Sequence, residues 1–351
     1  MDERKLGWLR ALPDWPRIPL AQLPTPIQRA ANLGRHLNRP ELWIKRDDLT
    51  GLAGGGNKTR KLEFLVGDAL KSGADTLVTV GAPQSNHTRQ TAAASARSSL
   101  RCALLHCAWT EDAGPHYRQV GNLLLSSLMG AELYVDATKR PIEDKGALDE
   151  LGEHLPRQGR RPYVIPGGGS DHRLGSLGYM ACAAEIAAQA MSRDIRFDCV
   201  VHTTGSSSTQ SGLLAGFAAL GEGTRVLGIS DDDETAIKRD RVLRLANATL
   251  EMLRLPERVA ESDVEVVVGD AGPYGVADTR TMDAILLLAR TEGLIADPVY
   301  EGKAVRGLLD LARSGYFRSD ARILLLHLGG TPAVNAYANQ FGTIDLKPFP
   351  T

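Results

Sequence analysis

Short, continuous apolar runs recur along the chain, and most of them end in glycine or in a polar turn. Such runs predict buried strands of a parallel sheet whose two faces are both covered. They lie at 76–82, 102–107, 132–136, 163–167, 199–205, 225–230 and 322–330.

The segments between these strands carry apolar residues at helical spacing. Residues 58–73, for example, place Leu62 and Leu65 on one stripe and end at a glycine. Further helices are predicted at 86–97, 175–190, 209–220, 282–291 and 303–314. Because strands alternate with helices, the pattern predicts an α/β fold with a parallel sheet. Glycine clusters near residues 55 and 165 mark where the chain would cross between two domains, if it forms two.

Composition narrows the classes of function. The 351 residues carry a formal net charge of −1, which gives no indication of a polyanionic partner such as nucleic acid. There is no run of about 18 apolar residues, so no membrane span is expected, and the first residues lack the apolar core of a signal peptide. No Cys/His spacing fits a zinc site, so no metal is predicted. The cysteines are expected to be buried free thiols, which suits a cytoplasmic location: they are Cys102, Cys107, Cys182 and Cys199.

The first candidate for chemistry is Lys58, which follows three glycines in segment 53–63 and begins a predicted helix. The glycines let the backbone approach a ligand closely. The helix dipole disfavours a charged lysine at this end, so the pKa of Lys58 is expected to fall, as an imine-forming lysine requires. The alternative is a solvated surface lysine. The spacing does not match a Walker A loop.

Two further segments each follow a predicted strand and open a helix. In 81–95, Ser85 or Asn86 can cap the helix, and exposed amides there would hold a carboxylate. Ordinary capping is the alternative, and a lone histidine such as His87 is more often structural. In 202–212, small hydroxyl residues with glycine form a cup that suits phosphate, with a flexible turn as the alternative. The absence of GxGxxG disfavours a dinucleotide.

Two later loops add to this set. In 293–304, Tyr300 and Glu301 precede a helix and could face a cofactor, although a solvated turn is equally compatible. In 327–337, a diglycine after a strand could line the edge of a planar ligand or form a tight turn. A lysine, a phosphate cup, a carboxylate site and an acidic group together suit pyridoxal phosphate, which needs an imine lysine and a partner for its ring nitrogen.

Six motifs stand in order between about residues 20 and 340: WIKRDDLTGLAGGGNKTRKLEFL, GAPQSNHTRQTAAA, IPGGGSDHRLGSLGY, TGSSSTQSG, ADPVYEGK and HLGGTPAVNAY. In this combination they resemble the family of 1-aminocyclopropane-1-carboxylate (ACC) deaminases and D-cysteine desulfhydrases. The resemblance implies the tryptophan-synthase-β-like fold (fold type II) of pyridoxal-phosphate enzymes, with two parallel-sheet domains. It implies a large cofactor domain of residues 1–55 and 166–351, a small domain of residues 56–165, and a homodimer.

The resemblance also assigns roles to the cofactor-binding residues. Lys58 is the implied Schiff-base lysine. Glu301 is the implied partner of the pyridine nitrogen, where a carboxylate keeps the ring protonated. Asn86 would stack near the ring oxygen or bond to it, and Leu328 would lie at the cofactor. The implied phosphate site consists of Thr204, Gly205, Ser206, Ser207, Ser208 and Thr209.

The implied substrate site lies beside the cofactor. Ser85 would contact the substrate carboxylate and assist catalysis, with Asn86 and His87 next to it. Tyr300, and Tyr274 in the AGPYG motif, would face the substrate as an acid, a base or a group that positions a nucleophile. The implied substrate is a small amino acid.

Within the family, the sequence carries features of both branches. Glu301 and Leu328 form the deaminase pair, whereas His87 and the GSSSTQ phosphate loop match the desulfhydrases. The AGPYGVA motif is one residue shorter than its deaminase counterpart, which shifts Tyr274. Gly54 replaces an aromatic residue of the family and enlarges the space beside the lysine.

Three readings of function follow. The first and favoured one is ACC deamination to 2-oxobutanoate and ammonia. Because ACC has no α-proton, a nucleophile or a base must act at a ring carbon, and Tyr300 and Ser85 are the candidates. The second is α,β-elimination from D-cysteine or another β-substituted amino acid to pyruvate, ammonia and the leaving group, with Lys58 as the base. The third is an inert cofactor-binding protein, against which the intact lysine argues.

Overall fold

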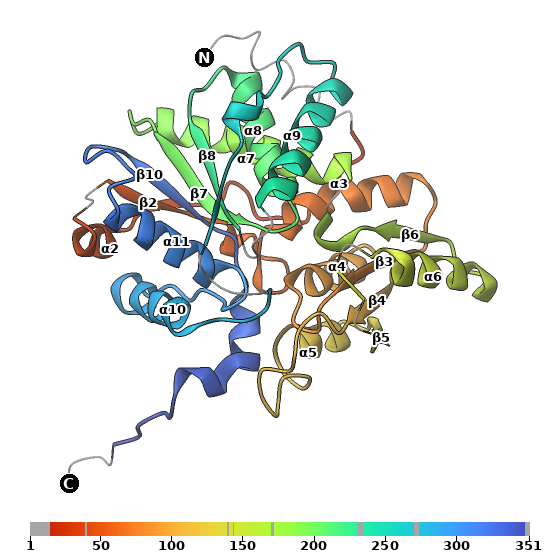
Figure 1. The fold of residues 1–351 in the computed structure, drawn as a ribbon. Helices are drawn as coiled ribbons and strands as arrows, with labels where there is room; N and C mark the ends of the chain where they lie inside the picture. Colours follow the sequence, from red (N-terminus) through yellow and green to blue (C-terminus); the bar gives the residue numbers. More distant parts are fainter. Residues whose placement is uncertain are drawn as a thin grey trace.

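The computed structural model describes residues 15–38, 41–138, 140–142, 144–169, 172–230, 235–269 and 274–347, and Figure 1 shows their arrangement. The predicted strands are all confirmed: β3 (Thr76–Gly81), β4 (Arg101–Cys107), β5 (Glu132–Asp136), β6 (Pro162–Ile165), β7 (Cys199–Thr204), β8 (Arg225–Ser230) and β10 (Ile323–His327). So are the predicted helices: α3 (Lys58–Lys71), α4 (Asn86–Arg97), α7 (Arg173–Met191), α8 (Ser208–Leu220), α10 (Thr279–Glu292) and α11 (Glu301–Arg313). The α/β class read from the pattern is therefore correct.

Within the described residues, the larger sheet has six strands in the order β1–β2–β10–β7–β8–β9. The additional strands are β1 (Ile27–Arg29), β2 (Leu42–Arg46) and β9 (Glu265–Val268). Neighbouring strands are parallel, except that β1 runs antiparallel to β2.

Helices cover both faces of the larger sheet. Successive residues of a strand point to opposite faces, so neighbouring residues pack against different helices. Val200 and Leu324 pack with apolar residues of α3, α7 and α8, whereas Val201 and Leu325 pack with α10 and α11. Figure 1 shows these two groups of helices on opposite sides of β7 and β10. Continuous apolar strands are what this double coverage requires.

The second sheet is parallel throughout and, in the part of the chain described, has four strands in the order β5–β4–β3–β6. Leu151 of α6 (Gly146–His154) packs with Val78 and Leu105 on one face, and Ala92 of α4 packs with Leu104 on the other. These strands all lie within residues 56–165, and those of the larger sheet lie outside that range. This distribution supports the division at residues 56 and 165, which we keep as a proposal, since α3 packs against the larger sheet.

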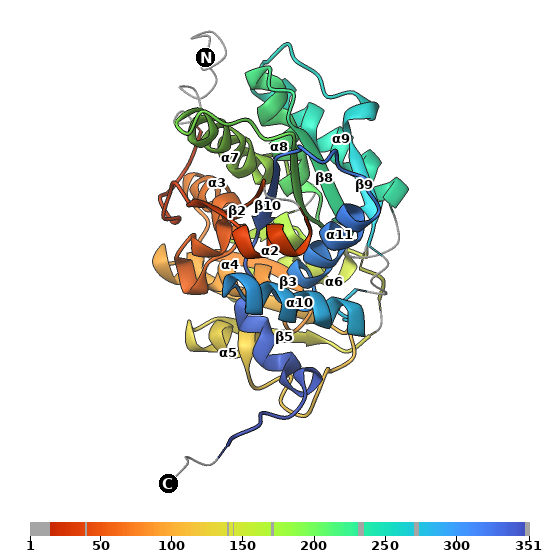
Figure 2. The same ribbon diagram turned by 90° about the vertical axis from the view of Figure 1, so that its left-hand side faces the viewer.

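The sequence analysis missed the shorter and more polar elements. In β2, Lys45 and Arg46 interrupt the apolar run, yet Lys45 is buried because it pairs with Glu185. Edge strands β1 and β9 have only three and four residues. The helices not predicted are α2 (Ala31–His36), α5 (Gly121–Leu128), α6 and α9 (Thr235–Met252). Figure 2 shows the segment that follows η8 (Thr331–Phe341) leading away from both sheets.

Three global expectations can be compared with the structure. All four cysteines are buried free thiols, as predicted. None of the described helices is long and apolar enough to cross a membrane. Among the described residues, no group of three or more His, Cys, Asp or Glu side chains could hold a metal ion.

Candidate active site

A cavity of about 210 Å³ lies where strands of both sheets end. Its wall includes Val80 and Gly81 of β3 and Thr203 and Thr204 of β7. The helices α3, α4 and α11 begin at the same wall, so their N-termini face the cavity. A single water needs only roughly 10–15 Å³ of such space, so the cavity is large enough for a small-molecule ligand.

The structure brings nearly all predicted site residues to this cavity. Its wall contains Lys58, Ser85, Asn86, His87, Thr204, Gly205, Ser206, Ser207, Thr209, Tyr274, Tyr300, Glu301 and Leu328. Ser208 is the exception, because it lies behind the wall and its Oγ accepts a hydrogen bond from Lys61 Nζ at 2.7 Å.

The candidate lysine stands on the first residue of α3. Lys58 Nζ donates to Asn57 Oδ1 at 3.1 Å, and Asn57 Nδ2 donates to Thr209 Oγ1 at 3.2 Å. The preceding Gly56 has φ of +124°, and a Cβ there would lie 2.6 Å from Nε2 of Gln90. Only glycine allows this approach, so the glycine segment is what brings the lysine to the cavity.

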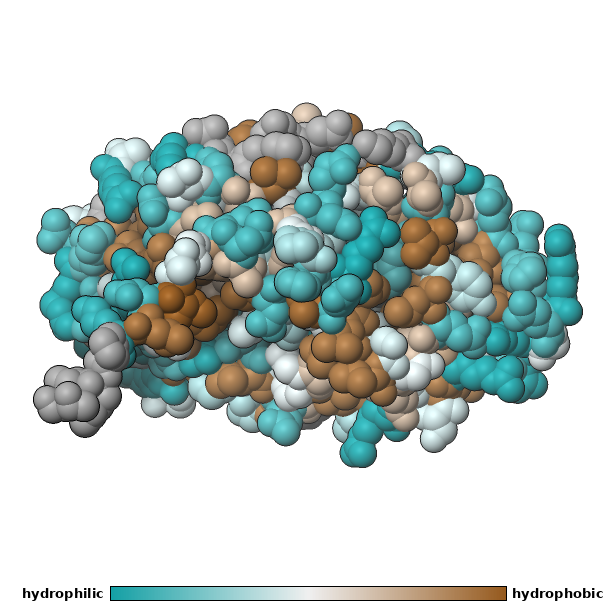
Figure 3. All heavy atoms as spheres, turned by 90° about the horizontal axis from the view of Figure 1, so that it is seen from below, coloured by the Kyte–Doolittle hydropathy of each residue, from teal (hydrophilic) through white to brown (hydrophobic). Residues whose placement is uncertain are grey.

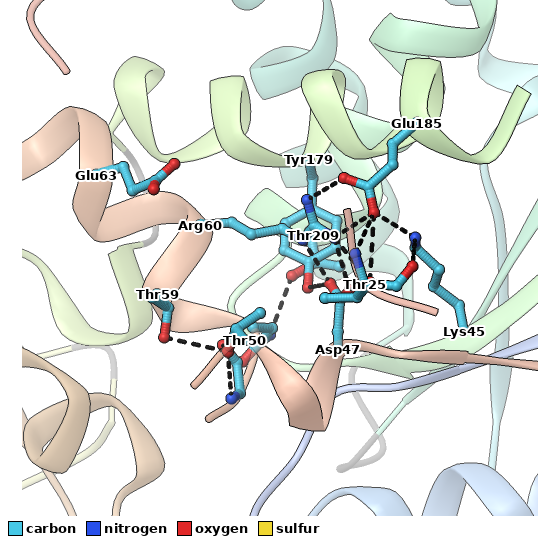
Figure 4. Close-up of polar contacts among 12 residues, drawn as sticks. Thr25, Lys45, Asp47, Thr50, Thr59, Arg60, Glu63, Tyr179, Glu185 and Thr209 are labelled. Atoms are coloured by element: carbon cyan, nitrogen blue, oxygen red, sulfur yellow. Dashed lines mark hydrogen bonds and ion pairs between the residues drawn. The ribbon is translucent and has the colours of Figure 1, made fainter. Parts of the chain in front are cut away.

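A buried ion cluster two residues further along fixes α3 (Figure 4). Arg60 Nε and Nη2 each lie 2.8 Å from the Asp47 carboxylate, and Nη1 donates to Glu185 at 2.9 Å. Tyr179 Oη donates to Asp47 at 2.6 Å, and Lys45 pairs with Glu185. Burial alone would raise the pKa of Asp47, but Arg60 and Lys45 hold it below its usual value. The cluster therefore ties α3 to β2 and α7 in one geometry.

The candidate phosphate site lies at the start of α8. Ser207 has φ of +65°, an uncommon conformation for a residue other than glycine. Its hydroxyl and that of Thr204 are buried, and neither has a hydrogen-bond partner among the described residues. Unsatisfied donors at a helix N-terminus match the oxygens of a phosphate group.

Lys61, which the sequence analysis did not name, is not part of the cavity wall but lies close behind the candidate phosphate site. It is buried behind the phosphate loop, where it donates to Ser208 Oγ. Burial, and then the charge of Lys58, lower its pKa well below the usual range. A phosphate would supply the counter-charge. The signal that could have found Lys61 is its spacing of three residues from Lys58 on one helix face.

Asp297 was missed as well, although it stands in the ADPVYEGK motif. Its Oδ1 accepts from Val299 N at 2.8 Å and from Tyr300 N at 2.9 Å, which shapes the turn that begins α11. Burial raises the pKa of Asp297 to about 6. The residue lines the cavity beside Glu301.

Glu301 fits the nitrogen of a pyridine ring. Its Oε1 is buried with no hydrogen-bond partner among the described residues, and Oε2 lies 3.8 Å from Nδ1 of His327. That Nδ1 accepts from Gly329 N at 3.2 Å, so it offers no proton to the carboxyl. Burial, and then the charge of Asp297, raise the pKa of Glu301 well above its usual value. A protonated ring nitrogen would satisfy the unpaired oxygen.

A chain of side chains orients the amide of Asn86. Arg89 Nε donates to Asn122 Oδ1 at 2.7 Å, so the other end of the Asn122 amide is a donor. Asn122 Nδ2 donates to Asn86 Oδ1 at 2.8 Å. Asn86 Nδ2 is thereby left as the donor for a ligand, as a bond to a cofactor oxygen requires.

Ser85 caps α4, which confirms it as one of the two predicted capping residues. Its Oγ accepts from the amides of His87 and Thr88 at 3.2 and 3.3 Å, so these amides are engaged rather than exposed. The hydroxyl proton of Ser85 remains available, and it could be donated to a carboxylate.

Two tyrosines meet at the cavity. Tyr274 Oη and Tyr300 Oη lie 2.5 Å apart. Residues 271–273, with which the AGPYG motif begins, lie outside the described part of the chain. Tyr274 itself is described and lies beside Tyr300. Trp109, which the sequence analysis missed, also lines the cavity, and its buried Nε1 has no hydrogen-bond partner in the part of the chain described.

The comparisons with known proteins agree with this geometry. A family model described as "Pyridoxal-phosphate dependent enzyme" matches residues 18–329. The chain is 43% identical over 330 residues to a 1-aminocyclopropane-1-carboxylate deaminase of Burkholderia vietnamiensis, which covers 93% of this chain and 98% of the relative. It is 44% identical, with the same coverage, to the enzyme of that name from Burkholderia cenocepacia strain J2315. A solved structure titled as an ACC deaminase homologue matches with a TM-score of 0.86 and 37% identity, over 97% of this chain and 99% of that one.

Proposed function

Because the chain belongs to the family of pyridoxal-phosphate dependent enzymes, we propose that it hydrolyses ACC to 2-oxobutanoate and ammonia. The observation that carries the proposal is the pair of hydroxyls of Tyr274 and Tyr300, 2.5 Å apart in the cavity that holds Lys58 and Glu301. ACC has no α-proton, so its ring needs a second reactive group besides the lysine. The names of the relatives support this substrate.

Several residues around the cavity would each hold a different part of the cofactor. When bound, pyridoxal phosphate supplies an aldehyde that condenses with amines and a ring that withdraws electrons. Lys58 would hold the aldehyde carbon. Thr204, Ser207 and Lys61 would hold the phosphate, Asn86 Nδ2 would donate to the ring oxygen, and Glu301 would pair with the ring nitrogen.

The remaining residues would handle the substrate. Ser85 donates its hydroxyl proton to the carboxylate and fixes the amino acid at the start of α4. Within the tyrosine pair one hydroxyl donates to the other, so the pair could relay a proton: as one oxygen attacks, its proton would pass to the other hydroxyl, which would give its own proton to the substrate. Leu328 and Glu301 are the pair that favours deamination in the family resemblance.

A second candidate is α,β-elimination from D-cysteine or another β-substituted amino acid. It is supported by His87. Gly54 does not enlarge the cavity as predicted, because it is not part of the cavity wall and a Cβ there would lie 3.5 Å from Pro332 and 3.8 Å from Arg89. Lys58 would then remove the α-proton, and the tyrosine pair would assist departure of the leaving group.

The deciding experiment incubates the purified holoenzyme separately with ACC and D-cysteine and measures the keto acid. Formation of 2-oxobutanoate from ACC supports the proposal. Pyruvate and sulfide from D-cysteine, without turnover of ACC, would replace it with elimination. The control Lys58→Ala should lose both the imine absorbance band and all turnover. An absorbance band that depends on Lys58, with no turnover of either substrate, would show that the protein binds the cofactor. The substrate would then have to be sought among other amino acids.

We further propose a cytoplasmic homodimer. Figure 3 shows apolar side chains gathered on the face from which the C-terminal segment projects. Leu128 of α5 is 72% exposed, and Ile344 and Leu346 of the C-terminal segment are 83% and 85% exposed. Apolar side chains exposed to this degree suit contact with a second copy. Sedimentation equilibrium would give the mass, and a monomer at micromolar concentration would contradict the proposal.

A further inference from the structure

The backbone beside Tyr274 is held by a residue far along the chain. Tyr337 of η8 donates its hydroxyl proton to the carbonyl oxygen of Gly275, the residue that follows Tyr274, at 3.0 Å. Tyr337 is buried and is not part of the cavity wall. It can therefore influence the reaction only through the segment that it holds.

A second side chain packs against the same glycine. Gly275 has φ of +76°, a conformation that favours glycine, and a Cβ there would overlap Cγ2 of Thr110. Thr110 Oγ1 lies 3.2 Å from the hydroxyl of Tyr117. The rings of Tyr117 and Tyr337 meet edge to face, with their centroids 5.7 Å apart. The residue next to Tyr274 is thus fixed by one hydrogen bond and by close packing.

The hydrogen bond from Tyr337 has one direction only. A carbonyl oxygen can only accept, so the phenol must be the donor. Burial, and then the neighbouring Tyr117, raise the pKa of Tyr337 above its usual value, so the phenol keeps its proton. The bond to Gly275 therefore persists over the working range of pH.

The other tyrosine of the pair is anchored separately. Tyr300 stands at the start of α11, where its backbone N–H donates to Asp297 Oδ1 at 2.9 Å. The hydroxyls of Tyr274 and Tyr300, 2.5 Å apart, thus come from two segments with different anchors. A misplacement of about 1 Å can lower a reaction rate roughly 10²-fold, so loss of one anchor should be detectable in the rate.

We propose that Tyr337 is a positioning residue: its hydrogen bond to Gly275 holds the Tyr274 hydroxyl within hydrogen-bond distance of Tyr300. The inference rests on the proposed function in taking the tyrosine pair to participate in the reaction. Tyr337 itself touches neither the substrate nor the cofactor.

The variant Tyr337→Phe removes the hydroxyl and keeps the ring. With whichever of ACC and D-cysteine is turned over, kcat should fall roughly ten- to hundredfold, while the affinity for pyridoxal phosphate stays within about twofold. Tyr163→Phe is the matched control, because it removes a hydroxyl that donates to Asp68 at 2.7 Å outside the cavity wall. Its kcat should equal that of the wild type.

A double-mutant cycle separates positioning from a merely structural role. In a Tyr274→Phe background, Tyr337→Phe should lower kcat by less than about twofold further, because the hydroxyl that it positions is already gone. A loss of equal size in both backgrounds would show that Tyr337 acts independently of Tyr274, and it overturns the inference.

Hydrogen exchange followed by mass spectrometry tests the anchor without any substrate. Peptides that contain residues 274–278 should exchange faster in the Tyr337→Phe holoenzyme than in the wild type, whereas peptides from β7 should be unchanged. Unchanged exchange at 274–278 overturns the inference. Faster exchange there, with full kcat in Tyr274→Phe, would mean that the anchor is confirmed while the proposed use of the tyrosine pair fails.

Discussion

Asn122 Nδ2 lies 2.8 Å from Asn86 Oδ1, and this hydrogen bond decides which end of the Asn86 amide faces the cavity. Asn122 is outside the cavity wall, and its own orientation is set by Arg89, a guanidinium that can only donate. Arg89 therefore fixes the orientation of the Asn122 amide, and Asn122 in turn fixes the orientation of the Asn86 amide at the cavity.

Replacing Asn122 tests this relay. In Asn122→Ala the Asn86 amide is free to rotate, so the affinity of the cofactor-free protein for pyridoxal phosphate should fall roughly tenfold, the effect of one hydrogen bond. Absorbance titration measures it. Ser126→Ala, on the same helix, removes only a bond to the Asn122 carbonyl and is the control. Unchanged affinity in Asn122→Ala would mean that the relay does not orient Asn86.

Lys61 should act on the phosphate alone. Lys61→Met should weaken binding of pyridoxal phosphate about 10- to 100-fold, because a charge-assisted hydrogen bond is lost. Binding of pyridoxal, which lacks the phosphate, should stay within about twofold of the wild type. Equal losses for both ligands would instead point to a general disturbance of α3.

The tyrosine pair should matter for chemistry more than for cofactor binding. Tyr300→Phe and Tyr274→Phe should each lower kcat for ACC by roughly 10²-fold or more, since general acid–base groups contribute about 10²–10⁴-fold. The cofactor absorbance band should be unchanged in both. If Tyr274→Phe retains full kcat, the shortened loop has removed Tyr274 from the reaction.

Asp297 should make the cofactor-free protein less stable as pH rises. Its folded pKa of about 6 exceeds the ordinary value of 3.8, so the folded state binds more protons between these values. The resulting loss of unfolding free energy grows from about pH 4 to pH 6 and then stays constant. It amounts to roughly 3 kcal/mol, because the pKa of Asp297 is raised by about two units. Asp297→Asn should therefore gain stability relative to the wild type between pH 4 and pH 7. Urea unfolding of both proteins at pH 4 and pH 7 measures this gain. The same difference in unfolding free energy between Asp297→Asn and the wild type at the two pH values would contradict the prediction.

The ion cluster behind α3 should be far more sensitive than surface pairs. Arg60→Ala leaves the carboxylates of Asp47 and Glu185 buried without their partner and should cost roughly 3–5 kcal/mol of unfolding free energy. Arg225→Ala breaks a pair with Glu265 in which Arg225 is 47% exposed, and it should cost at most about 1 kcal/mol. Similar costs for the two variants in urea unfolding would show that the cluster is not critical.

The sequence by itself determined most of the strands and helices that form the cores, because apolar periodicity is a local property; β2, α6 and α9 also contribute core residues and were missed. Strands such as β7 and β10 are continuous apolar runs, and Ser85 caps α4 where a capping residue was expected. The loops after the parallel strands and the family resemblance together named many of the residues that line the cavity, since such loops meet at one edge of a sheet, but Trp109 and Asp297 were missed. Charged β2 was missed because its burial depends on ion pairs with distant residues.

Only the tertiary structure decided how the site is tuned. Asn122 orients Asn86 across 36 residues of sequence, Lys61 reaches Ser208 across 147, and Tyr337 reaches Gly275 across 62. The direction of a hydrogen bond and the protonation of a buried group depend on partners brought together by folding. Local sequence can therefore name the residues of the site, while their donor, acceptor and charge states are set by the packed chain.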